Sequence, residues 1–211
     1  VSVGDYDKDG YLDLIIAGLD DYEDKDGITD ENGNPVVHHD RRMLYLYKNN
    51  KGKGFIRQET PLDDDKPFTG LSRGSVHFAD MDNDGWLDIE YSGYSDKTST
   101  ALKTYINQQN GSFADLTPDN LTGAFQGQST LADINGDGTL DIISTGNGDN
   151  WACLAPIYYN TTDGSGHLSF RHVPETESGI LGVSRANPLV ADFNADGRMD
   201  MIINGEPSDG S

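Results

Sequence analysis

The aspartate residues of this sequence gather into one nine-residue pattern, D-x-[DN]-x-D-G-x-x-D, which occurs four times. The copies read DYDKDGYLD, DMDNDGWLD, DINGDGTLD and DFNADGRMD, and they begin at Asp5, Asp80, Asp133 and Asp192. Side chains at positions 1, 3 and 5 of a tight loop can converge on one point, and the glycine at position 6 permits the sharp turn. The pattern therefore supplies an all-oxygen ligand set, which suits a hard cation with flexible geometry such as Ca²⁺.

The candidate ligands occupy the same five positions of each copy. Positions 1, 3, 5 and 9 offer side-chain oxygens, and position 7 offers its backbone carbonyl. They are Asp5, Asp7, Asp9, Tyr11 and Asp13; Asp80, Asp82, Asp84, Trp86 and Asp88; Asp133, Asn135, Asp137, Thr139 and Asp141; and Asp192, Asn194, Asp196, Arg198 and Asp200. A plain turn needs only one or two Asp or Gly residues, so the fixed register predicts about four Ca²⁺ ions.

The residues that follow each loop exclude an EF-hand. An EF-hand needs an acidic residue at position 12 and a helix on both sides, whereas position 12 is Ile16, Tyr91, Ser144 or Ile203. The following runs LDLIIAG, LDIEYSG, LDIISTG and MDMIING are β-rich and end in glycine. We therefore expect each loop to join two β-strands.

Two further segments recur after each loop and its strand. One is a strand that ends in Tyr-x-Asn, and the other follows a polar turn and opens on Phe. The Asn residues are Asn49, Asn107 and Asn160, and the Phe residues are Phe55, Phe113 and Phe170. Each repeat therefore predicts four strands, which is the content of one β-propeller blade.

The four loops, with a glycine thirteen residues after each first Asp, resemble the FG-GAP/VCBS repeats of integrin-alpha-type propellers. The bacterial-style VCBS form is the closer likeness. The resemblance implies that the calcium loops lie on one face of a propeller, and that ligands use the opposite face.

On this interpretation the chain is all-β and forms one partial β-propeller over residues 1–211. The blade units lie at about residues 1–61, 74–117, 127–174 and 186–206, with an acidic insertion at about 19–40. The last unit has only two strands, which gives about three and a half four-stranded blades. Closed propellers have about four to eight blades, so we expect the chain to be continuous with further blades, most simply in a seven-bladed ring.

One acidic segment within the insertion leaves two interpretations open. Tyr22–Asp30 imitates a fifth loop but has Tyr at position 1, so either a solvated insertion or a weak fifth site fits it.

The formal net charge of the chain is -21. Phosphate binding needs a basic face, so this charge argues against nucleic acid and an anionic membrane surface. No apolar run approaches the roughly 18 residues of a membrane span, and we expect no membrane insertion.

We expect no enzyme activity from this chain. Residues 70–74, GLSRG, formally match a nucleophile elbow around Ser72, but that motif works on a strand-to-helix turn and here a loop leads into a strand. The candidate ligand residues are Asn150 and Trp151, in the Gly-rich loop GNGDNWACLA. An exposed Trp suits sugar stacking or a protein hot spot, although an aromatic packed between blades fits the sequence equally well.

The expected function is a calcium-stabilised binding or adhesion module that recognises a protein or glycan ligand. Extracellular calcium modules with dissociation constants of about 10⁻⁴–10⁻³ M fill only outside the cytosol, so we expect an extracellular or cell-surface location. The alternative, which also comes from the family resemblance, is a non-catalytic propeller accessory to a secreted enzyme such as a polysaccharide lyase or phospholipase.

Overall fold

The computed structural model describes residues 1–23, 29–34, 37–59, 61–64, 66–95, 99–163 and 167–207. These residues contain sixteen β-strands and one short helix, α1 (Glu175–Ser178), which confirms the predicted all-β class. Within the described ranges, no helix has the length and apolar character needed to span a membrane.

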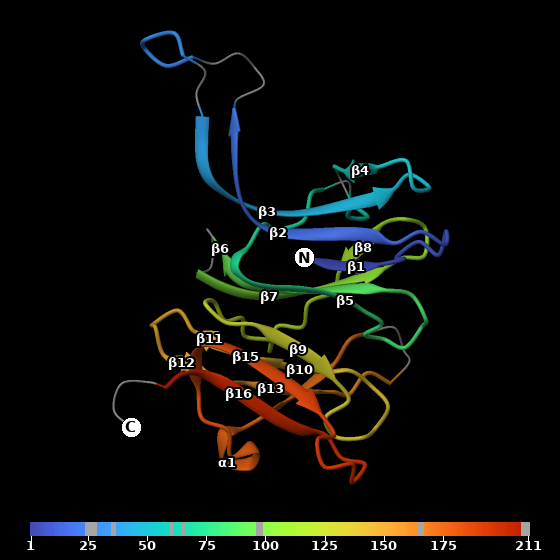
Figure 1. The fold of residues 1–211 in the computed structure, drawn as a ribbon, viewed down its shortest axis with the longest axis vertical. Helices are drawn as coiled ribbons and strands as arrows, with labels where there is room; N and C mark the ends of the chain where they lie inside the picture. The colour runs from blue at the N-terminus through green and yellow to red at the C-terminus, as the bar shows by residue number, and fades with distance from the viewer. Residues whose placement is uncertain are drawn as a thin grey trace.

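The strands form four antiparallel sheets of four strands each (Figure 1). The first blade contains β1 (Ser2–Gly4), β2 (Asp13–Glu23), β3 (Val37–Asn49) and β4 (Phe55–Gln58). The second contains β5 (Ser72–Ala79), β6 (Asp88–Ser95), β7 (Ser99–Asn107) and β8 (Phe113–Asp115). The third contains β9 (Ser129–Ala132), β10 (Asp141–Ser144), β13 (Ile157–Asn160) and β14 (Phe170–Val173). In all three, neighbouring strands follow one another along the repeat, as the four-strand unit predicts.

The fourth sheet combines two units of the chain. Its hairpin of β15 (Val183–Ala191) and β16 (Asp200–Pro207) carries the last Asp-rich loop. The other two strands, β11 (Gly146–Asn147) and β12 (Cys153–Leu154), come from the third unit, directly after β10 and before β13. Leu154 pairs with Val183, and this pairing joins the hairpin to the third blade.

The first strand of each unit, here named its inner strand, packs beside that of the next unit: β1 beside β5, β5 beside β9, and β9 beside β15. Apolar side chains fill the spaces between the sheets. Leu46 of the first blade and Tyr91 of the second share one core cluster, while Ile106 of the second and Ile142 of the third share another. Each blade therefore buries its faces against a neighbour, as expected for propeller repeats. The number of blades in a complete ring stays a prediction.

The acidic insertion continues the sheet. β2 and β3 pair as far as Glu23 and Val37, and they form a long ribbon that stands away from the rest of the molecule (Figure 1). The candidate fifth loop, Tyr22–Asp30, includes residues 24–28, which lie outside the described residues.

The glycine thirteen residues after each first Asp has a steric role in three of the four units. A β-carbon on Gly93, Gly146 or Gly205 would lie 2.7, 2.5 or 2.7 Å from a backbone oxygen of the segment that enters the inner strand. Real β-carbons are almost never closer than about 3.0 Å to such an atom. At Gly18, in the first blade, nothing lies within 4 Å. Glycine is therefore required where the inner strand of a blade passes closest to its second strand.

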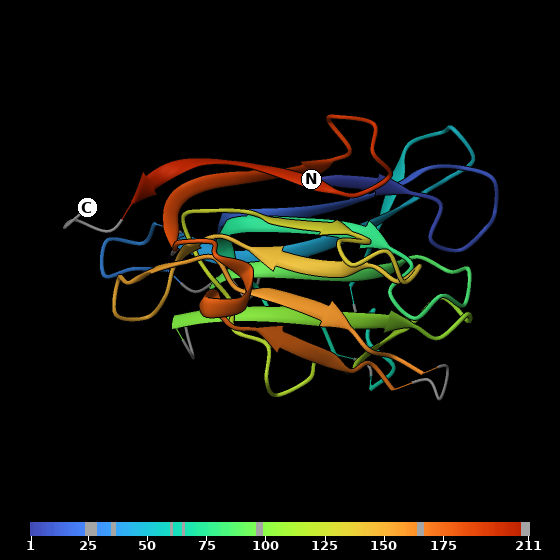
Figure 2. The ribbon, with the colours of Figure 1, turned by 90° about the horizontal axis from the view of Figure 1, so that it is seen from below.

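All four Asp-rich loops share one end of the sheets, here named the loop end. Each loop follows an inner strand, and the arrows of β5, β9 and β15 point to the same side in Figure 1. Figure 2 shows these loops again on a common side. The turn between β11 and β12 lies at the other end of the strands, here named the opposite end.

Candidate metal centres

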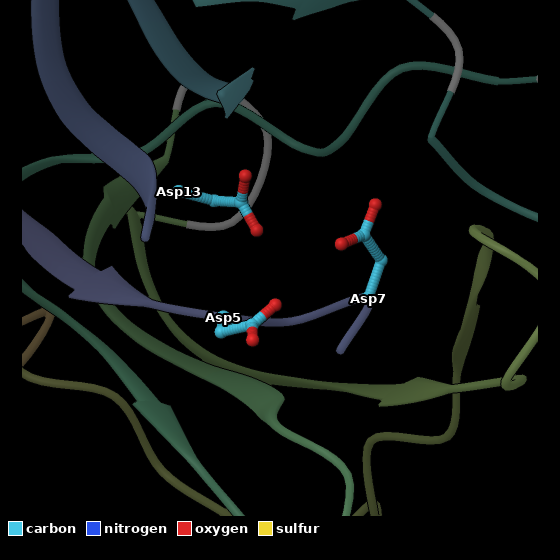
Figure 3. Close-up of side chains that lie close together, drawn as sticks. All are labelled: Asp5, Asp7 and Asp13. Carbon is cyan, nitrogen blue, oxygen red and sulfur yellow. The ribbon is translucent and has the colours of Figure 1, made fainter. Parts of the chain in front are cut away.

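The structure brings carboxylates of the predicted ligand set together at the loop end. Figure 3 shows Asp5, Asp7 and Asp13 facing a common space, and a carboxylate oxygen of each lies within 4.8 Å of one from the other two. The same relation holds in the second loop for Asp80, Asp82 and Asp88. Positions 1, 3 and 9 therefore converge in these two loops, whereas Asp9 and Asp84 at position 5, which the spacing also predicted to converge, belong to neither group.

Each loop is closed by its first Asp. In the second loop, the backbone N–H of Asp84 donates to Asp80 Oδ1 at 3.0 Å, and that of Gly85 donates to Asp80 Oδ2 at 2.8 Å. The same two bonds form around Asp5, Asp133 and Asp192. The position-6 glycine has a φ of 84–88° in all four loops, a conformation that glycine adopts without steric cost. Four identical turns thus follow from one local pattern.

The Asp at position 9 is the buried anchor of each complete blade. Asp13, Asp88 and Asp141 are each 0 % exposed. Asp88 accepts hydrogen bonds from the backbone N–H groups of Met81 and Asn107, both at 2.8 Å. Burial raises the pKa of Asp88 to about 7, and it also raises the pKa of Asp13 and Asp141. A cation beside such a carboxylate would stabilise its charged form.

The positions 3, 5 and 7 form a second layer of contacts within each loop. The backbone N–H at position 7 donates to the Asp at position 5, as from Trp86 to Asp84 Oδ1 at 2.8 Å. Tyr11, Thr139 and Arg198 make the corresponding bonds to Asp9, Asp137 and Asp196. Asn135 and Asn194 each accept an N–H bond from the position-5 Asp at 2.9 Å. The carbonyl at position 7 remains a predicted ligand.

The Asn of the Tyr-x-Asn signature links neighbouring loops, a role that the sequence did not suggest. Asn107 Nδ2 donates to the carbonyl oxygen of Leu87 in its own loop at 3.0 Å, and to that of Tyr6 in the loop of the first blade at 2.8 Å. Asn160 repeats this arrangement, with bonds to Leu140 and to Met81 in the second loop. The repeated Tyr-x-Asn pattern was the sequence signal for this Asn. The pattern did not indicate that one of its hydrogen-bond partners lies in the preceding blade.

The first loop contains a side-chain cation among its carboxylates. Lys48 Nζ bonds the carboxylate of Asp7 and lies 3.4 Å from Asp9 Oδ2. In the second loop, a neutral amide takes a similar place, because Gln109 Nε2 donates to Asp84 Oδ2 at 2.8 Å. The ammonium in the first loop indicates that this cluster favours positive charge. The all-oxygen donor set is of the kind that a hard cation prefers, and the bound ion stays a prediction.

The other predicted site residues lie at or near the opposite end. Trp151 is 64 % exposed, so it is not packed between blades. Asn150 is exposed beside it, and its Oδ1 accepts a bond from the N–H of Ala152 at 3.2 Å. Ser72 begins β5 and is 3 % exposed.

Comparison with known families gives one match. A profile of the FG-GAP-like repeat matches residues 5–89, 92–144 and 133–203, which together cover most of the chain and include all four loops. No curated protein matches the chain. The repeated loops, the four-stranded sheets and this match agree, and the chain belongs to the FG-GAP-like repeat family.

Proposed function

We propose that this protein is a calcium-stabilised, β-propeller-like binding module that holds about four Ca²⁺ ions at its loop end. The observation that carries the proposal is the convergence of the carboxylates at positions 1, 3 and 9 of the first two loops within 4.8 Å. The third and fourth loops have Asn at position 3 and keep the same internal hydrogen bonds. An amide oxygen is also a Ca²⁺ ligand, so these loops belong to the same proposal.

The proposed role of the metal is structural. Each loop joins the inner strand of a blade to its second strand, and it concentrates acidic side chains that repel one another. Four Ca²⁺ ions would reduce the formal charge of the loaded protein from -21 to about -13. Binding would therefore relieve repulsion and fix the strand connection, without providing a reaction centre.

The proposed ligand surface lies at the opposite end, and the ligand is a protein or a glycan. An extracellular or cell-surface location fits calcium sites with dissociation constants of about 10⁻⁴–10⁻³ M. We propose that this chain catalyses no reaction. Ser72, at the centre of the one motif that imitates a nucleophile, is buried in a strand. A nucleophile elbow must instead present its Ser on an exposed turn.

Calorimetric titration of the metal-free protein with CaCl₂ tests the metal part of this proposal. The expected result is about four bound ions per chain, and one ion fewer for Asp84→Ala, which removes a position-5 carboxylate. Asp64→Ala is the matched control, because Asp64 is an acidic residue outside the loops. Absence of binding at millimolar Ca²⁺ would reject the proposal.

A further inference from the structure

The contact between the second and third blades contains a group of polar side chains, here named the polar seam. On the second blade, His77, Glu90 and Thr104 lie directly opposite one another on β5, β6 and β7, so they share one face of the sheet. On the third blade, Ser129 and Ser144 are paired in the same way on β9 and β10. Ser129 Oγ donates to Glu90 Oε2 at 2.8 Å, so the two faces meet. These five residues make up the polar seam.

The repeat gives each residue of the polar seam a counterpart in the contact between the first and second blades. In the order His77, Glu90, Thr104, Ser129 and Ser144, the counterparts are Ser2, Ile15, Leu46, Val76 and Tyr91. The last four counterparts are apolar or aromatic and belong to one core cluster. The contact between the third and fourth blades is apolar as well, with Ile143 and Ile157 in its core. Among the three blade contacts in the described ranges, the polar seam is therefore a departure from the repeat.

Most of the polar seam is removed from solvent. Glu90, Thr104 and Ser144 are each 0 % exposed. Apolar side chains continue the same two faces: Ile106, two residues after Thr104, and Ile142, two residues before Ser144, belong to one core cluster. A polar group buried in such surroundings costs free energy unless it forms hydrogen bonds. The partners of each seam atom therefore decide what the seam can hold.

A chain of hydroxyl groups leads to one oxygen of Glu90. Ser75 Oγ accepts a bond from the backbone N–H of Ser129 at 2.8 Å, and it lies 2.7 Å from Ser129 Oγ. Ser129 Oγ in turn donates to Glu90 Oε2. Because a serine hydroxyl has one proton, Ser129 then accepts the proton of the Ser75 hydroxyl. These direct bonds satisfy one oxygen of the carboxyl group, Oε2.

The remaining polar atoms of the seam have no direct partner. Among the described residues, the buried side-chain atoms without a hydrogen bond include His77 Nε2, Glu90 Oε1, Thr104 Oγ1 and Ser144 Oγ. His77 Nε2 lies 4.0 Å from Glu90 Oε2, which is too long for a direct hydrogen bond. Native proteins leave few buried polar atoms unsatisfied, and here four of them come from one contact. A shared partner would satisfy them together, and polar atoms separated by more than about 3.5 Å are often bridged by water.

We propose that the polar seam binds internal water, which bridges Glu90 Oε1 to the imidazole of His77 and to the hydroxyls of Thr104 and Ser144. Thr104, Ser129 and Ser144 are each smaller than their counterparts, which leaves room for it. His77 is larger than its counterpart, but 34 % of its side chain stays exposed. A buried water usually makes about three hydrogen bonds, and hydroxyl partners can both donate to it and accept from it. The inference goes beyond the proposed function and does not depend on calcium or on a ligand.

A metal ion fits the polar seam less well than water does. Zinc takes about four ligands from Cys, His, Asp or Glu, and calcium takes about six to eight oxygen ligands, several of them carboxylates. The seam offers one imidazole and one carboxyl group. In the part of the chain that the structure describes, the groups of three or more such side chains that could share an ion lie in the first two Asp-rich loops. The donor set of the seam therefore favours a neutral guest that both donates and accepts hydrogen bonds.

A crystal structure of the calcium-loaded chain tests the proposal directly. We expect an ordered water within hydrogen-bond distance of Glu90 Oε1 and of Thr104 Oγ1 or Ser144 Oγ. A second crystal, soaked in rubidium chloride, separates water from an alkali cation, because rubidium scatters anomalously and water does not. An anomalous peak in the seam would overturn the proposal. Side chains that close on one another without a water between them would overturn it as well.

A fourfold variant tests the seam in solution. It combines Glu90→Ile, Thr104→Val, Ser129→Ala and Ser144→Ala, and it makes the contact apolar like the one between the first two blades. Magnetic relaxation dispersion of the water oxygen counts long-lived internal waters, and the variant should show at least one fewer than the parent chain. Its melting temperature should stay within about 4 °C of the parent, because replacing all partners by apolar groups is nearly neutral. An unchanged number of long-lived waters would contradict the proposal.

Two single variants show whether the polar partners act together. Glu90→Ile alone should lower the melting temperature by about 4 °C or more, because it removes the acceptor of the Ser129 hydroxyl and a partner of the water. Ile15→Glu is the matched control, since it places the same carboxyl group among apolar counterparts that offer no hydroxyl. It should lower the melting temperature by about 8 °C or more. A parent-like melting temperature for either variant would count against a seam whose polar groups need one another.

Discussion

The second and fourth Asp-rich loops share one pattern and one set of internal hydrogen bonds, but their surroundings differ. In the second loop, Asp88 is fully buried and accepts bonds from Met81 and from Asn107 of the third strand. In the fourth, Asp200 is only partly buried and accepts a 3.2 Å bond from Phe193; among the described residues no third-strand N–H reaches it. The nine residues therefore build the turn, while the rest of the blade buries its last carboxylate.

Removal of the position-9 carboxylate should give the largest effect and the sharpest contrast. Asp88→Ala leaves two buried N–H groups without an acceptor, and we expect a loss of roughly 3 kcal/mol in the free energy of unfolding. Asp200→Ala should cost only about 1 kcal/mol, because water can reach its single donor. Urea unfolding in calcium measures both, and equal losses would show that burial of this carboxylate does not matter.

Removal of the interloop Asn should give the next largest effect. Asn107→Ala breaks the side-chain bonds to Leu87 and Tyr6, and we expect a loss of about 2 kcal/mol. It should also weaken calcium binding at the first loop, which the side chain contacts through Tyr6. Asn50→Ala, at an exposed turn position, is the control and should stay within about 0.5 kcal/mol of the parent. If Asn107→Ala left calcium binding at the first loop unchanged, this result would refute the link between the two loops.

The raised pKa of Asp88 predicts a pH dependence whose sign differs with and without calcium. The metal-free folded chain keeps a proton on Asp88 up to a pKa of about 7, whereas an unfolded Asp loses it near a pKa of about 3.9. The metal-free stability contributed by this group is therefore full below about pH 4 and falls as pH rises towards 7. In calcium, the proton competes with the metal, so binding weakens as pH falls below about 7.

Melting curves between pH 5 and pH 8 check this prediction. The gap in melting temperature between calcium-loaded and EDTA-treated protein should widen as pH rises. Asp88→Asn, which cannot titrate, should flatten the trend. A gap that is constant across this range in the parent chain would contradict the role of Asp88.

The smallest predicted effect concerns the cation of the first loop. Lys48→Met removes the ammonium that contacts Asp7 and Asp9, and we expect calcium to bind this loop a few-fold more tightly. The metal-free chain should lose at most about 1 kcal/mol, because the pair is partly exposed. Calorimetric titration measures the change. Gln109→Met in the second loop is the matched control, since it removes a neutral donor, and it should leave calcium affinity closer to that of the parent.

The sequence predicted the fold and the loops because their determinants are local. The register of Asp, Asn and Gly dictates the turn, and β-rich runs on both sides dictate strands. It did not predict the partners of Asn107, since Tyr6 lies in another blade. Nor did it predict that Arg73, Gln126 and Arg185 share a left-handed backbone conformation, because the triplets centred on them, SRG, FQG and SRA, differ.

The most direct test of the central claim is the melting temperature of the chain in 10 mM CaCl₂ and in EDTA. Four sites with dissociation constants of about 10⁻⁴–10⁻³ M would together add roughly 6 kcal/mol or more at this concentration. We therefore predict a rise of at least about 10 °C in calcium. Identical melting in calcium and in EDTA would contradict the account.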